Sequence, residues 1–132
     1  MKNILTLVAF LSVSLFAEFK TIDVAEFEKL QAQGVPVIDI RTPAEWKQIG
    51  IIKGAKKMMF FTPNGQALVA DWFFELGHIV KDKKQPFIIY CAHANRSKTL
   101  GKGLIQMGFE NVYELKGGIE NGWLKAGKSV VK

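Results

Sequence analysis

Short apolar runs alternate with segments of helical spacing along the chain. Strands are predicted at 35–40, 55–60, 86–91 and 111–115, and those at 35–40 and 86–91 are the apolar runs. Between and after them, the segments 23–34, 44–48, 66–81, 97–109 and 119–127 predict helices. Because the strands show no regular polar alternation, we expect an α/β domain whose parallel sheet is covered on both faces.

The residues at the ends of the first predicted helix support this assignment. Asp23 is a good N-cap for the first helix, with Glu26 three residues later and Gly34 after its last turn. The segment 66–81 is too short and too charged to span a membrane, since it contains Asp71 and Glu75. Its aromatic residues are expected to pack in the core or against a partner, with a lid over a site as the alternative.

Residues 1–17 differ from the rest of the chain. Lys2 is followed by an uncharged, mostly apolar stretch, and Ala17 comes directly before the first acidic residue, Glu18. This layout is typical of a secretory signal peptide, with an uncleaved anchor as the alternative. We therefore expect residues 18–132 to form one mature domain, exported, and periplasmic if the source is a Gram-negative bacterium.

Composition narrows the range of partners. The 132 residues are 48% hydrophobic and 23% charged, with a net charge of +6, or +5 once residues 1–17 are removed. The lysines are scattered, often in pairs, without a basic helix face or interleaved aromatic residues. This distribution favours a solvated surface over nucleic-acid binding, and its mild positive field would favour small anionic substrates.

Cys91 is the only cysteine, so an intramolecular disulfide and a cysteine-rich zinc site are both excluded. With only His78 and His93 as histidines, a metal centre has poor support, and no cofactor is expected. A single thiol is then either a small buried apolar residue or a nucleophile.

The position of Cys91 favours the nucleophile. It is the last residue of an apolar strand, and a helix is expected to begin about five residues later. In parallel sheets ligands bind beyond the carboxyl ends of the strands, where loop amides and a helix N-terminus stabilise negative charge. With Arg96 nearby, this setting favours the reactive thiolate.

Four motifs in order resemble the rhodanese-like domain family. The segment 37–46, VIDIRTPAEW, resembles its Asp-x-Arg-x-x-x-Glu stretch, and 50–55, GIIKGA, resembles its Gly-His-Ile-Pro-Gly-Ala segment. The segment 91–97, CAHANRS, is similar to its active-site loop, and 112–123, VYELKGGIENGW, to its closing Gly-Gly and Trp signature. Together these cover nearly all of the chain after residue 17.

The resemblance implies a five-stranded parallel sheet and sulfur transfer through a cysteine persulfide. It implies that Cys91 attacks the outer sulfur of a small anionic donor such as thiosulfate, and that a thiol, cyanide or protein acceptor later removes this sulfur. It places substrate-binding groups at Ala92, His93, Ala94, Asn95, Arg96 and Ser97: their amides cradle the sulfur or the leaving anion, Arg96 holds the loop or the donor, and Ser97 caps the following helix. It gives Asp39, Arg41 and Glu45 a structural role, with Arg41 paired to Glu45.

The chain departs from the family pattern at several positions. Ala94 replaces a common loop glycine, and a positive φ there would cost alanine about 1 kcal/mol or more. Ile51 and Lys53 replace the histidine and the proline of the second motif, and Ala92 stands where a long polar residue is frequent. His93 could tune the thiolate or contact the substrate, or it could be exposed without a special task.

Three alternatives to this function stay open from the sequence. A phosphatase or arsenate reductase needs five residues between the cysteine and the arginine, but only four separate Cys91 from Arg96. A non-catalytic binding module on the same scaffold would usually lack the cysteine. A persulfide relay with a protein partner would share the chemistry and could use residues 72–74 as a docking surface.

Overall fold

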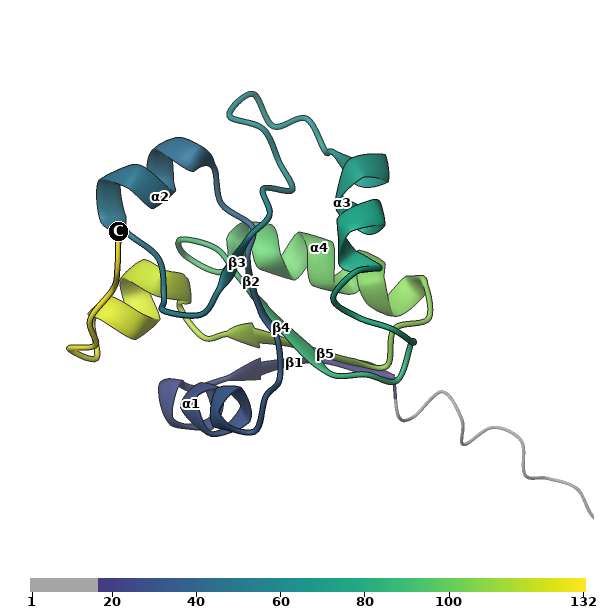
Figure 1. Ribbon diagram of the computed structural model, residues 1–132, viewed down its shortest axis with the longest axis horizontal. Helices are drawn as coiled ribbons and strands as arrows, with labels where there is room; N and C mark the ends of the chain where they lie inside the picture. Colours follow the sequence, from purple (N-terminus) through teal and green to yellow (C-terminus); the bar gives the residue numbers. More distant parts are fainter. Residues whose placement is uncertain (1–16) are drawn as a thin grey trace, which may run out of the picture.

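The computed structural model describes residues 17–132, which form a five-stranded parallel sheet with helices on both faces (Figure 1). The spatial order of the strands is β1-β5-β4-β2-β3, and every neighbouring pair is parallel. The strands are β1 (Glu18–Ile22), β2 (Val37–Asp39), β3 (Lys56–Lys57), β4 (Phe87–Tyr90) and β5 (Asn111–Leu115). The predicted α/β fold is confirmed.

Five helical segments connect or follow the strands. They are α1 (Val24–Ala32), α2 (Pro43–Ile49), α3 (Val69–Leu76), α4 (Asn95–Gln106) and the π-helix η2 (Ile119–Leu124). Asp23 is the N-cap of α1, as predicted, and its side chain accepts a hydrogen bond from the amide of Glu26 at 2.9 Å. Asn95–Gln106 is the longest helix of the described residues and begins directly after the loop that carries Cys91.

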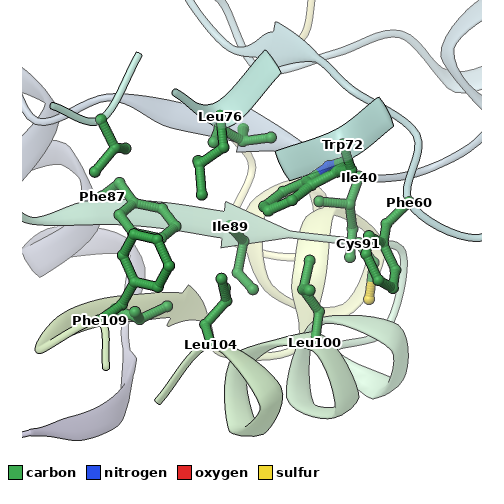
Figure 2. Close-up of a cluster of buried hydrophobic side chains, with 13 residues drawn as sticks. Ile40, Phe60, Trp72, Leu76, Phe87, Ile89, Cys91, Leu100, Leu104 and Phe109 are labelled. Atoms are coloured by element: carbon green, nitrogen blue, oxygen red, sulfur yellow. The ribbon is translucent and has the colours of Figure 1, made fainter. Parts of the chain in front are cut away.

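Two hydrophobic cores lie on opposite faces of the sheet, because successive side chains of β4 point in opposite directions. Phe87 and Ile89 pack in a cluster with Trp72 of α3 and Leu104 of α4 (Figure 2). Ile88 and Tyr90 belong to a second cluster that contains Phe27 of α1 and Trp123 of η2. The central strand is therefore buried on both faces, which is why it has no polar alternation.

Strand β1 was not predicted from the sequence. It pairs in parallel with β5 at one edge of the sheet, with Phe19 opposite Val112 and Ile22 opposite Leu115. Helix α4 approaches this strand closely at Gly101, where an added Cβ would lie 2.2 Å from Cε1 of Phe19. Because that position is glycine, the ring of Phe19 can lie directly against the helix.

Several predicted elements are shorter than expected, and two are shortened the most. The strand at 55–60 is reduced to Lys56–Lys57, and the helix at 66–81 to Val69–Leu76. Residues 17–132 contain no helix with the length and apolar character needed to cross a membrane. The predicted signal peptide, apart from Ala17, lies outside the described residues.

Candidate functional site

Cys91 follows directly after β4, at the carboxyl end of the sheet. Its side chain is 0% exposed and extends the core cluster of β4 beside Phe60, as Figure 2 shows. Residues 92–94 form a short loop, and α4 begins at Asn95, four residues after the cysteine. The thiol therefore lies at the N-terminal end of a twelve-residue helix, where the positive end of the helix dipole stabilises negative charge.

The sulfur of Cys91 has two hydrogen-bonding contacts, both with Ser97. The amide of Ser97 donates to Sγ at 3.4 Å, and Sγ lies 3.6 Å from Oγ of the same residue, toward which the thiol can donate. The prediction that Ser97 caps α4 is wrong. The helix begins earlier, at an N-cap position occupied by Ala94 without a side-chain cap, so Ser97 lies in the first turn with its hydroxyl turned inward.

The hydroxyl of Ser97 connects the thiol to a buried carboxylate that was not predicted. Ser97 Oγ donates to Oε1 of Glu114 at 2.6 Å, and Thr21 Oγ1 donates to Oε2 at 2.7 Å. Lys98 Nζ forms an ion pair with the same Oε2. Glu114 is 0% exposed. The sequence could have indicated this carboxylate, because the strand "NVYEL" contains an acidic residue. A charge buried in a strand destabilises the fold unless it is paired or hydrogen-bonded.

Backbone hydrogen bonds join the cysteine loop to the first residues of η2. The carbonyls of Cys91 and Ala92 accept hydrogen bonds from the amides of Ile119 and Glu120, at 2.9 and 3.0 Å. Gly118 has a φ of 69° and packs so tightly that an added Cβ would lie 2.4 Å from the carbonyl oxygen of Ala92. The Gly-Gly turn of the closing motif therefore fixes the backbone of the cysteine loop.

Ala94 is the only non-glycine residue with a positive φ among residues 17–132. Its φ is 72° and its ψ is 3°, in the left-handed region. An L-residue with a Cβ is disfavoured there by about 1–2 kcal/mol. Ala94 thus adopts the strained, positive-φ conformation that was predicted to be costly for alanine. Tertiary contacts hold the loop in this conformation.

An Ala94→Gly substitution is expected to raise the free energy of unfolding by about 1 kcal/mol, because glycine adopts this conformation without strain. Urea denaturation of both proteins measures the change. Ala44→Gly, at an exposed site inside α2, is the matched control and is expected to lower stability by about 0.5–1 kcal/mol. Equal losses at both positions would contradict the assignment of strain to Ala94.

Arg96 forms a bidentate ion pair with Glu45 of α2. Its Nη1 and Nη2 lie 2.8 and 2.7 Å from Oε1 and Oε2 of Glu45. The carboxylate also accepts the amide of Thr42, which caps α2 in a capping box. The pair joins the first turn of α4 to the first turn of α2. Whether Arg96 also binds the donor stays a prediction.

The predicted pairing of Arg41 with Glu45 is wrong. The guanidinium of Arg41 instead binds Asp39, two residues earlier, with Nη2 at 2.7 Å from Oδ2 and Nε at 3.0 Å from Oδ1. Nη2 also donates to the carbonyl of Gly50 at 2.6 Å. Both side chains are fully buried at the end of β2, whereas Glu45 lies on the first turn of α2 facing Arg96. The predicted structural role of these residues is consistent with these contacts.

The Arg96–Glu45 pair predicts a loss of stability in acid. Hydrogen bonds from Arg96 hold the pKa of Glu45 at about 2, below its ordinary 4.5. The charged carboxylate therefore stabilises the fold fully above about pH 4.5, and this contribution is lost as the pH falls through about 2; because solvent screens the partly exposed pair, we expect it to amount to about 1 kcal/mol. Urea denaturation between about pH 5 and pH 2 measures it.

An Arg96→Ala variant is expected to show a flatter pH dependence of stability over that range, because only the hydrogen bonds from Thr42 then favour the charged form of Glu45. The exposed Lys128–Glu28 pair, with 3.3 Å between Nζ and Oε1, offers the control: Lys128→Ala should leave the dependence unchanged. An unchanged slope in Arg96→Ala would show that other carboxylates cause the acid sensitivity.

The outer side of the loop is open to solvent. His93 is half-exposed, and its Nε2 lies 3.3 Å from Oε1 of Glu120. A cleft of about 720 Å³ lies beside the loop, between the first turns of α2 and α4 and the segment 61–65. Its walls include Thr42, Phe61 and Asn95 together with the Arg96–Glu45 pair. A molecule larger than thiosulfate could therefore reach the rim of the loop.

The parallel five-stranded sheet, with a cysteine loop between β4 and α4, defines an α/β domain of the rhodanese class. The family model of the rhodanese-like domain matches residues 23–126, and the chain belongs to this family. The predicted family is confirmed.

Curated relatives carry the name thiosulfate sulfurtransferase GlpE. The protein from Pseudomonas entomophila is 33% identical over 104 residues, covering 79% of this chain and 84% of the relative. The one from Pseudoalteromonas translucida is 34% identical over 101 residues, covering 76% and 85%. Among solved structures, the polysulfide-sulfur transferase homodimer of Wolinella succinogenes is 25% identical with a TM-score of 0.62, covering 83% and 76%. These relatives support a sulfurtransferase-type function.

Proposed function

We propose that this protein is a sulfurtransferase that takes a sulfur atom from a small anionic donor such as thiosulfate and carries it as a persulfide on Cys91. The observation that carries the proposal is the position of the only thiol, which lies at the carboxyl end of the sheet with the amide of Ser97 pointing at Sγ. The nucleophilic sulfur thus lies next to a hydrogen-bond donor that can stabilise its negative charge.

The reaction has two half-steps. The Cys91 thiolate attacks the outer sulfur of thiosulfate, a sulfur–sulfur bond forms on Sγ, and sulfite leaves with the electron pair of the broken bond. An acceptor such as cyanide or a thiolate then attacks the outer sulfur, and Cys91 leaves as a thiolate. Loop amides of residues 92–96 and that of Ser97 are proposed to stabilise the negative charge in both states.

The loop supports sulfur transfer better than phosphate transfer. Four residues separate Cys91 from Arg96, and the guanidinium of Arg96 is already neutralised by two bonds to Glu45. A phosphatase of this architecture would need that positive charge free for a tetrahedral oxyanion. The full burial of Cys91 also favours a site that accepts one sulfur atom over one that accepts a larger group.

Intact-mass spectrometry after treatment with thiosulfate tests the proposal. We expect the protein to gain the mass of one sulfur and to lose it again on addition of cyanide, with thiocyanate as product. Binding of thiosulfate without any covalent gain in mass would refute the persulfide and favour a non-catalytic binding module.

We also propose that residues 1–17 are a signal peptide and that the mature chain begins at Glu18. The charge and apolar pattern of this segment supports the proposal. Strand β1 begins at Glu18, so cleavage after Ala17 would leave the sheet intact. N-terminal sequencing of the protein from its native host is expected to start near Glu18, and an intact Met1 would exclude cleavage.

A further inference from the structure

One buried ionisable group, Glu114, has no part in the proposed mechanism. Its carboxylate lies in β5 with no solvent exposure and is linked to the Cys91 sulfur through a single hydroxyl, that of Ser97. Cys91, Ser97 and Glu114 are all 0% exposed. No solvent-exposed group stands between the thiol and the carboxylate.

The two oxygens of Glu114 have different surroundings. Oε2 accepts a hydrogen bond from Thr21 and forms the ion pair with Lys98. Among residues 17–132, Oε1 accepts only from Ser97, at 2.6 Å. Oε1 is therefore the oxygen with room for a proton, and it faces the hydroxyl that contacts the thiol.

The charges of this network favour proton transfer within it. With a neutral thiol, the positive charge of Lys98 balances the negative charge of Glu114. If Cys91 lost its proton to solvent, two negative charges would lie in the interior on either side of one hydroxyl. Lys98 balances Glu114, Arg96 is already paired with Glu45, and the Ser97 amide and the N-terminus of α4 supply only partial positive charge to the thiolate. Like charges that share a buried site oppose joint ionisation. Moving the proton from Sγ to Oε1 keeps the network neutral.

We propose that Ser97 and Glu114 form a buried proton relay for Cys91, which stores the thiol proton on Glu114 while the enzyme carries sulfur. The relay rests on the proposed function, since it serves the persulfide cycle. Ser97 is a catalytic residue because its hydroxyl contacts the reacting sulfur, and Glu114 is a positioning residue that acts through Ser97.

Protons and charges balance in each step of the relay. During loading, the Cys91 thiol gives its proton to Oγ of Ser97 while Ser97 gives its own proton to Oε1 of Glu114. The resulting thiolate takes the outer sulfur of thiosulfate, and sulfite leaves with two negative charges. During unloading, the acceptor removes the outer sulfur, and the released Cys91 thiolate takes the proton back from Glu114 through the same hydroxyl.

Infrared difference spectroscopy on the full protein tests the relay, with thiosulfate as the probe and intact mass as a parallel readout. We expect loading to produce the stretching band of a protonated carboxyl group, which shifts in D₂O and disappears on addition of cyanide. The band should be absent in Glu114→Gln, which keeps a carbonyl oxygen facing Ser97. Thr21→Ala should retain the band, because it changes only the contacts of Oε2.

Single-turnover release of sulfite gives the kinetic test. Glu114→Gln and Ser97→Ala are each expected to slow loading about 100-fold, the usual scale of a lost acid–base group. Lys102→Ala, at an exposed position of the same helix, is the control and should load at the wild-type rate. Ser97→Ala leaves Glu114 in place, so the test does not depend on the folding of a variant at the buried acid.

The outcomes separate the two proposals. A wild-type protein that gains one sulfur without a protonated-carboxyl band overturns the relay and leaves the sulfurtransferase proposal standing. Loading of Glu114→Gln and Ser97→Ala at the wild-type rate also overturns it. A wild-type protein that gains no sulfur refutes the proposed function, and the relay with it.

Discussion

Replacing Cys91 with alanine is expected to abolish sulfur transfer from thiosulfate to cyanide. The chain has no other cysteine, so no second thiol can carry the persulfide. Loss of a nucleophile costs on the order of 10⁴-fold or more in rate, which places the variant at the background of the assay. Thiocyanate formation measures the effect.

The fold should survive this substitution. Cys91 is a small core residue, and removing one buried atom of this size costs about 1 kcal/mol. Cys91→Ser keeps the size of the side chain and is the matched variant; it should be as inactive as Cys91→Ala. Circular dichroism confirms folding of both. Turnover in either variant comparable to that of the wild type would exclude Cys91 as the carrier.

Arg41→Ala is expected to cause the largest loss of stability, about 3–5 kcal/mol, because it leaves the carboxylate of Asp39 buried without its partner. The carbonyl of Gly50 also loses the donor that lies 2.6 Å away. A domain of this size has a total free energy of unfolding of about 5–15 kcal/mol, so the loss is a large share of it. Urea denaturation at neutral pH measures the difference.

A double variant tests the reason for this loss. Asp39→Asn combined with Arg41→Met removes both charges and keeps similar volumes, so it is expected to cost less than Arg41→Ala alone. Lys47→Ala, an exposed basic residue on α2, should change stability by no more than about 0.5 kcal/mol. A double variant that is no more stable than Arg41→Ala would show that packing, and not the unpaired charge, dominates.

The parts of the fold that could be predicted are those where burial is uniform along an element. Strand β4 is a continuous, fully buried apolar run, and the predicted bounds of β4 and β5 agree with the structure to within one residue. β1 was missed because it is an edge strand with little burial: in its segment "EFKTI" only Ile22 is buried and Phe19 is partly buried. β3 is short because its lysines are exposed and only two residues pair with β2.

The position of Cys91 could be predicted because it depends on order along the chain, where a strand ends and a helix begins. The partners of the charged residues could not. Arg41 has two acidic residues within four positions, and only the direction of the chain after β2 selects Asp39 over Glu45. The contact between Ser97 and Glu114 joins α4 to β5 across 17 residues, a distance over which no local spacing rule applies.

The place of β1 in the sheet has a consequence for how the molecule is assembled. β1 is the first strand of residues 17–132 to be synthesised, and within this part of the chain it pairs only with β5. Phe19 therefore cannot pair with Val112 until more than ninety further residues have been made. Such distant pairing delays the closing of this edge of the sheet until β5 has been synthesised. Thr21 donates a hydrogen bond to Glu114 and belongs to β1, so the surroundings of Glu114 are complete only once β1 has paired with β5.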